Sequence, residues 1–279
     1  MSEIKIPLKY GSVRANSFGN PKGKPVLAIH GWLDNSNSFL PLAQLLPEFH
    51  WVALDLPGHG KSVFKPTGNI YHFIDWIADL WEVIHHFHWK EFYLVGHSLG
   101  ASIAVFLPGL FPDKIKKLLL LDGLGPMTNQ PEELPETLKA HLAKLHQVRN
   151  NRKFFKDLAR AAKHRMKKGE LNFTSAQCLA SRGVVKSPQG YYWRYDPQLT
   201  LPSPVRLTED HVKAVLHEIQ CPTLLLYSNQ AELYYQQTLN LRKRWIKNLT
   251  AQKISGSHHF HLDDAEGISG IVREFLMSF

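Results

Sequence analysis

The stretch of the chain most suited to chemistry is the pentapeptide GHSLG at residues 96–100. An apolar run at 92–95 precedes it, and a helical pattern begins near Ala101. A serine placed between a strand and a helix in a G-x-S-x-G sequence sits on a sharp turn with its hydroxyl exposed. The helix that follows directs its positive N-terminal end toward negative charge developing there. Ser98 is therefore a candidate nucleophile, and the alternative is an ordinary Gly-Ser turn before a helix.

A serine nucleophile needs a base, because its hydroxyl is a weak nucleophile at neutral pH. The base is a histidine that a carboxylate holds in orientation. In a parallel-sheet protein with this turn, the chain order is serine, acid, histidine. Residues 256–263, which read GSHHFHLD, supply histidines after the last expected strand.

The elements that must position these residues follow an alternating pattern. Apolar runs typical of buried parallel strands alternate with segments of helical periodicity. We expect strands near residues 4–9, 13–18, 25–30, 51–56, 92–95, 118–121, 223–227 and 251–254. This alternation predicts an α/β protein with a doubly wound, mostly parallel sheet.

The alternation of strands and helices stops at Gly125. Residues 126–207 contain two helical stretches and an irregular, aromatic segment at 183–204. We therefore predict a core formed by residues 1–125 and 208–279, with 126–207 inserted as a helical lid over the carboxyl ends of the strands.

The composition of the 279-residue chain, with a net charge of +9, is that of a globular protein. We expect no secretory leader, because residues 1–5 show no basic stretch followed by an apolar one. No apolar run approaches about 20 residues, and Cys178 and Cys221 fit no metal or redox spacing. We expect a cytoplasmic protein without a transmembrane segment. Eleven Lys and Arg but one Asp lie between Glu136 and Glu170. This excess could attract anionic substrates or surfaces, and a solvated helical face is the interpretation we favour.

Four blocks of sequence carry a resemblance to a known family. They are HGWLDNSNSF from His30, DLPGHGKS from Asp55, GHSLG from Gly96 and GSHHFHLD from Gly256. Together they resemble the α/β-hydrolase fold serine hydrolases with a helical lid. The first block, together with YYWRYDP from Tyr191, is similar to the serine hydrolase-like esterase subgroup.

The resemblance implies roles for individual residues. Matching the segment 261–263 to the family's pattern makes His258 the base, with His259 and His261 as packing neighbours. It implies that the oxyanion is bound by two backbone N–H groups, from Leu99 after the serine and from Trp32 after His-Gly. The histidines in the turn motifs are interpreted as structural; they are His30, His59 and His97.

The acid departs from the family pattern, because its usual aspartate position is occupied here by Ala231. Two carboxylates could replace it. Glu232 lies one residue further on, and Asp122 directly follows the strand at 118–121, a location that some lidded hydrolases use. We favour Asp122 over Glu232. A third interpretation is that no acid is in place and the enzyme is weak or inactive.

The sequence thus predicts a serine hydrolase that cleaves carboxylic esters through an acyl-enzyme. Apolar faces of the insertion are expected to close over an acyl group, and they comprise Leu138, Leu142, Leu145, Phe154, Leu158 and Ala162. The expected partner is a small-molecule ester, with no cofactor, because no metal-ligand motif such as H-E-x-x-H is present.

Several alternatives share this site. A thioesterase, an acyltransferase and a carbon–carbon bond hydrolase use the same triad. A nucleophilic serine argues against dehalogenase or epoxide hydrolase chemistry, which needs a carboxylate. From another class, the chain could be a non-catalytic ligand-binding protein. Nucleic-acid binding is disfavoured, since no aromatic residues are interleaved among the charges of the basic segment.

Overall fold

The protein is built on a central sheet whose parallel strands end at one common edge. The candidate residues that follow these strands are therefore brought together there. The computed structural model describes residues 1–145, 147, 152–230 and 233–278. Within them, eight strands form one sheet in the order β1-β2-β4-β3-β5-β6-β9-β10. The strands are β1 (Ser2–Leu8), β2 (Gly11–Gly19), β3 (Pro25–Ile29), β4 (His50–Asp55), β5 (Phe92–His97), β6 (Ile115–Leu121), β9 (Thr223–Ser228) and β10 (Leu249–Ile254).

Strand direction follows the hydrophobic pattern. The strands from β4 to β10 in the sheet order run parallel, whereas β2 pairs antiparallel with both β1 and β4. The central strands β3, β4, β5, β6 and β9 are nearly continuous apolar runs because helices cover both of their faces. The mostly parallel α/β sheet predicted from the sequence is confirmed.

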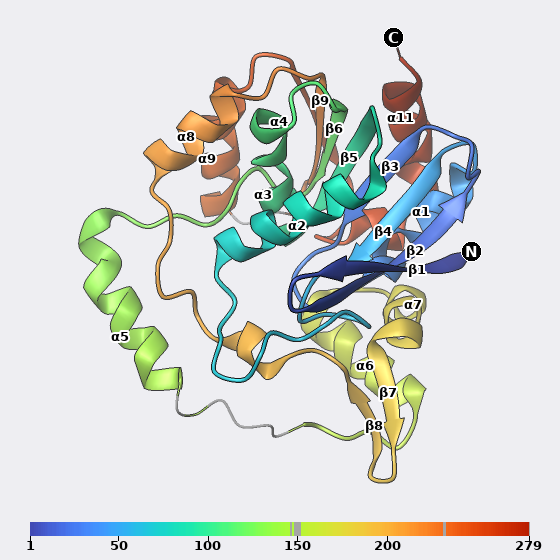
Figure 1. Cartoon of the computed structure of the whole chain (residues 1–279), viewed down its shortest axis with the longest axis vertical. Helices are drawn as coiled ribbons and strands as arrows, with labels where there is room; N and C mark the ends of the chain where they lie inside the picture. Colours follow the sequence, from blue (N-terminus) through green and yellow to red (C-terminus); the bar gives the residue numbers. More distant parts are fainter. Residues whose placement is uncertain (146, 148–151, 231–232, 279) are drawn as a thin grey trace.

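Helices cover the two faces of the sheet and enclose two apolar clusters (Figure 1). One face packs against α2 (Phe73–Phe87), α3 (Leu99–Ala104), α4 (Leu107–Leu110), α8 (Glu209–His217) and α9 (Leu233–Arg242). The other face packs against α1 (Leu40–Leu45), α10 (Phe260–Asp263) and α11 (Ala265–Met277). Short 3-10 turns are η1 (Ser36–Phe39), η2 (Pro131–Glu133), η3 (Pro197–Thr200) and η4 (Lys243–Trp245).

Between β6 and α8 the chain leaves the sheet and forms elements of its own. They are α5 (Leu134–Leu145), α6 (Leu158–Gly169), α7 (Phe173–Gly183), β7 (Val184–Ser187) and β8 (Gly190–Trp193). α6 packs on α7 around a small apolar cluster that also includes Leu262 of α10. In Figure 1, α6, α7 and the hairpin lie together below the sheet, and α5 stands apart at the left.

Two expectations for this part of the chain need correction. The segment 183–204 was expected to be irregular, but β7 and β8 form an antiparallel hairpin there. The apolar face of α5 was expected to be covered, but Leu138, Leu142 and Leu145 are 37%, 58% and 37% exposed. Helical periodicity identifies an apolar face correctly, but it does not say what that face packs against.

Candidate active site

Ser98 occupies a tight turn between β5 and α3. Its backbone has φ 52° and ψ −113°, an uncommon conformation for a residue with a side chain, and its N–H donates to the Leu121 carbonyl at 3.0 Å. The flanking glycines allow the close approach of neighbouring backbone. A β-carbon on Gly100 would lie 1.9 Å from the Ile29 carbonyl oxygen, and one on Gly96 would lie 2.5 Å from the Gly100 carbonyl oxygen. The turn thus requires the glycines of the pentapeptide.

Asp122 lies at the end of the next strand, β6, and contacts His258. Its N–H donates to the Leu226 carbonyl at 2.8 Å, and its Oδ1 accepts from the Ser228 N–H at 2.9 Å. Its Oδ2 lies 2.5 Å from Nδ1 of His258. The Asp122 side chain is 3% exposed and that of His258 is 40% exposed. With the proton on Nδ1 held by the carboxylate, Nε2 of His258 is left as a base.

The backbone of His258 is tied to the serine turn. Nε2–H of His97, the residue before Ser98, donates to the His258 carbonyl oxygen at 3.0 Å, and the two rings lie 4.8 Å apart. Among the described residues no hydrogen bond joins Ser98 Oγ to His258. Catalytic hydrogen bonds of this kind are often long without substrate and tighten when it binds.

The two N–H groups expected to bind an oxyanion belong to segments that lie next to the same serine. Leu99 is the first residue of α3, and the first N–H groups of a helix have no carbonyl partner within it. Trp32 follows Gly31, where a β-carbon would lie 3.2 Å from Cβ of Ser98, so this loop passes beside the serine. The Trp32 indole, half exposed, donates from Nε1 to the Leu199 carbonyl at 3.0 Å.

The competing acid cannot be compared in the same way, because Glu232 lies outside the described residues, as does Ala231. The carboxylate that the structure brings to the His258 ring is that of Asp122.

Comparison with known proteins agrees with this fold. The family model described as alpha/beta hydrolase fold matches residues 24–265. The chain belongs to the α/β hydrolase fold family. It is 31% identical to a serine hydrolase-like protein of Danio rerio, over 99% of this chain and 88% of the relative.

Solved structures show the same relationship. A hypothetical protein of Pseudomonas aeruginosa PAO1 is 36% identical, with a TM-score of 0.91, over 99% of this chain and 98% of its own. A thioesterase domain from the curacin biosynthetic pathway is 26% identical, with a TM-score of 0.85, over 98% and 99% of the two chains. These relatives support a hydrolase. No helix among the described residues of this α/β hydrolase is long and apolar enough to cross a membrane.

A buried polar cluster lies behind the serine of this hydrolase. Oδ1 of Asp34 pairs with Nη2 of Arg165 at 2.6 Å. Its Oδ2 lies 3.4 Å from Nε2 of His259 and 3.7 Å from Nδ1 of His97. Burial acts to raise the pKa of Asp34, but the neighbouring His259 and Arg165 hold that pKa well below its usual range. Burial holds the pKa of His97 well below its usual range, so this imidazole is neutral at pH 7.

Asp34, His97 and His259 are also residue types that bind Zn²⁺, and their ligand atoms lie within 4.8 Å of one another. However, Arg165 already supplies a positive charge at the Asp34 carboxylate, and a metal cation would be repelled by that guanidinium. We interpret the cluster as a positioning device that connects the loop after β3, the serine turn and the segment of His258.

The remaining motif histidines have structural partners. His30 accepts the Leu56 N–H at Nε2 (3.0 Å) and lies 2.7 Å from the Gly31 carbonyl through Nδ1. Nε2 of His261 lies 2.9 Å from the hydroxyl of Ser38. The side chains of His30, His59 and His261 are all fully buried.

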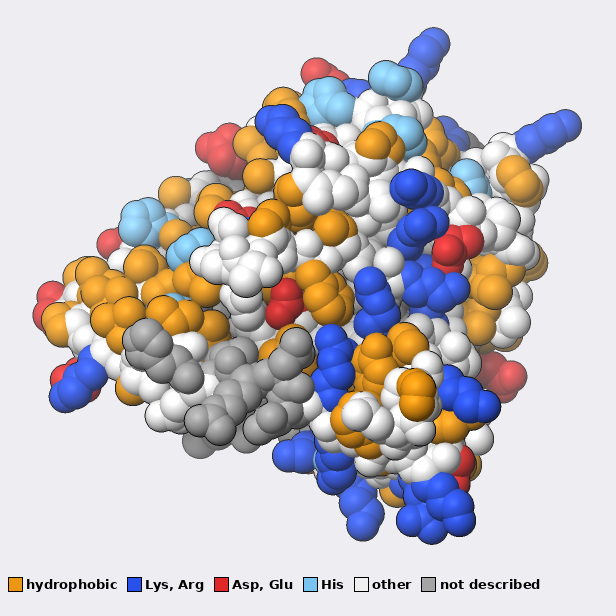
Figure 2. Space-filling view, turned by 60° about the horizontal axis from the view of Figure 1, so that its bottom comes forward, with side chains coloured by type: hydrophobic (Ala, Val, Ile, Leu, Met, Phe, Trp, Pro, Cys, Tyr) orange, Lys and Arg blue, Asp and Glu red, His pale blue; other side chains and the backbone are white. Residues whose placement is uncertain are grey.

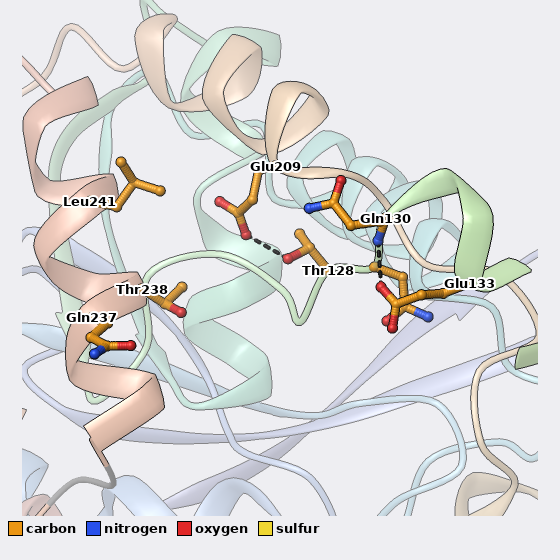
Figure 3. Close-up of a pocket in the computed structure, with 8 residues that line it drawn as sticks. Thr128, Gln130, Glu133, Glu209, Gln237, Thr238 and Leu241 are labelled. Carbon is orange, nitrogen blue, oxygen red and sulfur yellow. Dashed lines mark hydrogen bonds between the residues drawn. The ribbon is translucent and has the colours of Figure 1, made fainter.

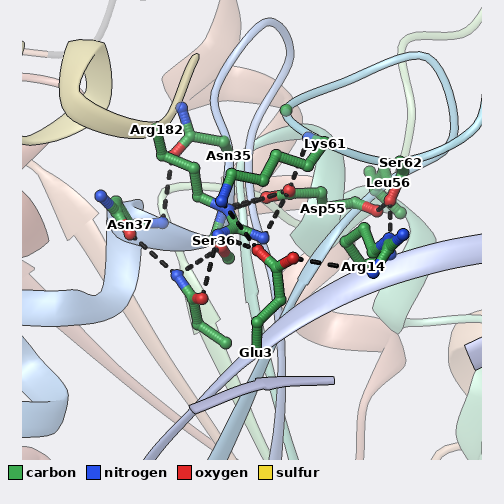
Figure 4. A network of polar contacts seen from close by, with 12 residues as sticks. Glu3, Arg14, Asn35, Ser36, Asn37, Asp55, Leu56, Lys61, Ser62 and Arg182 are labelled. Carbon is green, nitrogen blue, oxygen red and sulfur yellow. Dashed lines mark hydrogen bonds and ion pairs between the residues drawn. The ribbon is translucent and has the colours of Figure 1, made fainter. Parts of the chain in front are cut away.

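A second polar network, which the sequence did not reveal, anchors the inserted segment to the core (Figure 4). The buried carboxylate of Asp55 accepts from Nε of Arg182 in α7 at 2.9 Å and from the N–H groups of Ser36 and Lys61, each at 2.8 Å. Arg182 also donates to Oδ1 of Asn16 at 2.9 Å. The network therefore fixes α7 against the same loop, after β3, that carries Trp32.

Two hollows in the structure differ in the residues that line them. A polar one of about 240 Å³ lies between α9 and residues 128–133 (Figure 3). There Thr128 donates to Glu209, which in turn pairs with Arg242, and no candidate catalytic residue lines it. A larger cavity of about 720 Å³ includes Trp32 among its lining residues. The larger cavity is therefore the candidate for substrate binding.

The apolar residues expected to line a substrate pocket do not line this larger cavity. Those residues are Leu138, Leu142, Leu145, Phe154, Leu158 and Ala162. Its apolar surface comes instead from the loop of Trp32 and Leu33, from Phe155, and from apolar and aromatic residues of β8 and the segment up to Leu201.

Proposed function

We propose that the protein is a serine hydrolase that cleaves carboxylic esters through an acyl-enzyme. The observation that carries the proposal is the contact of Asp122 with Nδ1 of His258, next to a serine held at positive φ. This combination has a nucleophile, a base and a carboxylate in the order that the fold requires.

In the proposed mechanism, His258 Nε2 removes the Ser98 hydroxyl proton as Oγ attacks the ester carbonyl carbon. Asp122 keeps the ring in the required tautomer and stabilises the imidazolium that forms. The N–H groups of Leu99 and Trp32 stabilise the oxyanion of the tetrahedral intermediate. The imidazolium returns its proton to the leaving alcohol. Water, activated by the same imidazole, then releases the acid from Ser98.

A thiol nucleophile is disfavoured by the state of the two cysteines. Cys178 and Cys221 are free, and burial raises the pKa of each thiol to about 11. Almost no thiolate is therefore present at neutral pH. A cytoplasmic location is consistent with two free thiols and is part of this proposal.

Residues 126–207 are proposed to act as the lid of this hydrolase. Support comes from the residues around the larger cavity, which come both from this segment and from the loop of Trp32. We propose that the apolar part of the acyl group packs against Trp32, Leu33 and Trp193. Each buried methylene contributes about 0.8 kcal/mol, roughly fourfold in binding. Rates should therefore rise from acetate to hexanoate esters.

Labelling with a fluorophosphonate tests the mechanism. The wild-type protein should be labelled and should hydrolyse p-nitrophenyl butyrate, and Ser98→Ala should do neither. Ser269→Ala, on α11, is the matched control and should behave as wild type. Retention of labelling or of most turnover by Ser98→Ala would exclude the serine mechanism.

A thioesterase is the second candidate, favoured by the likeness to the curacin thioesterase domain. The same groups would attack a thioester, whose leaving thiolate needs less help from the imidazolium. Hydrolysis of hexanoyl-N-acetylcysteamine and of ethyl hexanoate, measured side by side, separates the two candidates.

A further inference from the structure

The larger cavity combines aromatic and basic side chains. Its volume is about 720 Å³, and its aromatic lining includes Tyr192, Trp193 and Tyr195. Trp32, whose N–H is proposed to bind the oxyanion, lines it too. Because Gly31, the residue before Trp32, lies beside Ser98, the cavity adjoins the loop that passes the serine.

The charged lining of the cavity is of one sign. Lys144, Arg152, Lys153, Arg165 and Lys168 line it, and no Asp or Glu is found among its described lining residues. Burial together with Lys153 and Lys168 lowers the pKa of His164, which also lines the cavity. Figure 2 shows Lys and Arg side chains gathered over the middle and lower parts of the face that it draws.

Two of these cations hold buried N–H donors without partners. Nη1 of Arg152 and Nε of Arg165 are buried and make no hydrogen bond within the described residues. Arg152 is otherwise held over the Tyr192 ring, with its guanidinium carbon 4.4 Å from the ring centroid. Among the described residues, the carboxylate partner of Arg165 is Asp34, at its Nη2. Unpaired buried donors of a cation are costly, and an anionic oxygen is their natural acceptor.

We propose that the substrate carries an anionic oxygen group, a carboxylate or a phosphate, that binds in this cavity to Arg152, Arg165 and Lys168 while its carbonyl lies at Ser98. The aromatic side chains contact the apolar part of the same molecule. The proposal rests on the hydrolase function proposed above and narrows its substrate class. Under this proposal the basic segment between Glu136 and Glu170 is a binding surface and not only a solvated helical face.

Two substrate pairs distinguish the sources of the negative charge. The first pair is the p-nitrophenyl monoester of glutarate and p-nitrophenyl pentanoate, which differ by a terminal carboxylate. The second is hexanoyl-4′-phosphopantetheine and hexanoylpantetheine, which differ by one phosphate. In at least one pair kcat/KM should favour the anionic member by ~10-fold or more, as expected for hydrogen bonds to charged groups. Equal values in both pairs would overturn the proposal.

Charge-removing variants locate the effect. In Arg152→Gln and in Lys168→Gln the ratio of kcat/KM for the anionic over the neutral member should fall by ~5-fold or more. Lys167→Gln is the control, because Lys167 is exposed on the same helix and does not line the cavity. An equal loss for both members of a pair, or an effect of Lys167→Gln as large as that of Lys168→Gln, would contradict the proposal.

A binding measurement separates this proposal from the catalytic one. Glutarate and pyrophosphate are titrated calorimetrically into Ser98→Ala and into Ser98→Ala/Arg152→Gln. Binding to the first protein that weakens ~10-fold in the second supports the anion site even if wild type fails to react with fluorophosphonate. Labelling of Ser98 without any anion binding or substrate preference would leave the hydrolase intact and remove the anion site.

Discussion

Oδ2 of Asp122 lies 2.5 Å from Nδ1 of His258, although 136 residues separate them in the chain. The sheet creates this contact. Asp122 leaves β6 between the neighbouring strands β5 and β9, and its other carboxylate oxygen is held by the Ser228 N–H. The carboxylate is thus fixed from both sides before any substrate binds.

Replacement of this carboxylate is the direct test of its role. Asp122→Asn should lower kcat for ester hydrolysis by ~10³–10⁴-fold, because the amide favours the wrong imidazole tautomer and cannot stabilise the imidazolium. Glu232→Gln is the comparison and should cost less than ~10-fold. Circular dichroism checks that both variants are folded. A larger loss in Glu232→Gln than in Asp122→Asn would reverse the assignment.

Replacing two helical glycines by alanine should change the stability of the protein in opposite directions. Gly100→Ala should destabilise the protein strongly and abolish activity, because its β-carbon would lie 1.9 Å from the Ile29 carbonyl oxygen. Gly270→Ala in α11 meets open space and should raise the free energy of unfolding by ~0.5–1 kcal/mol. Urea unfolding monitored by fluorescence measures both. A Gly100→Ala protein with wild-type stability would show that the turn tolerates a side chain.

Local sequence predicted those parts of the site that depend on one segment. Ser98 stands out through its flanking glycines between a strand and a helix, and His258 through its place after the last strand. Asp122 was found because an apolar strand ends immediately before it. Periodicity locates the element next to each of these residues, and the resemblance to the family selected His258 among the neighbouring histidines and supported Asp122.

The contacts that the sequence did not predict are those between distant segments. Asp34, His97, Arg165 and His259 come from four separate parts of the chain, and no spacing connects them. The cavity has the same origin, since the basic residues of α6 could equally have faced solvent. The hairpin of β7 and β8 was missed because its half-buried side chains give no clear alternation.

The Asp55 network predicts a large loss of folding stability when Arg182 is replaced. Arg182→Met should lower the free energy of unfolding by ~3–5 kcal/mol, because it leaves the buried Asp55 carboxylate without its cation. Arg160→Met, at a side chain 67% exposed on α6, should change it by less than ~0.5 kcal/mol. Urea denaturation at pH 7.5 compares the two. Similar costs for both variants would show that the network does not stabilise the anchored segment.

The buried histidines predict how stability depends on pH. Burial, with His30 close by, lowers the pKa of His59 to about 3, and burial, with His259 close by, lowers that of His261 to about 3. In the unfolded chain each titrates near 6.5. As the pH falls below 6.5 the unfolded state gains protons that the folded state does not, so stability is lost from there down to about pH 3. Asp79, whose pKa burial raises to about 6, acts in the opposite sense below that pH.

A difference measurement isolates the histidine contribution from that of Asp79. His59→Gln removes one buried imidazole, so the loss of unfolding free energy between pH 6.5 and 4.5 should be smaller than in wild type by roughly 1 kcal/mol per pH unit. His217→Gln, at an exposed position in α8, is the matched control and should leave the wild-type slope unchanged. Urea midpoints at half-unit pH steps give the slopes. If His59→Gln and His217→Gln have the same slope as wild type, His59 is protonated in the folded protein and its burial does not exclude the charge.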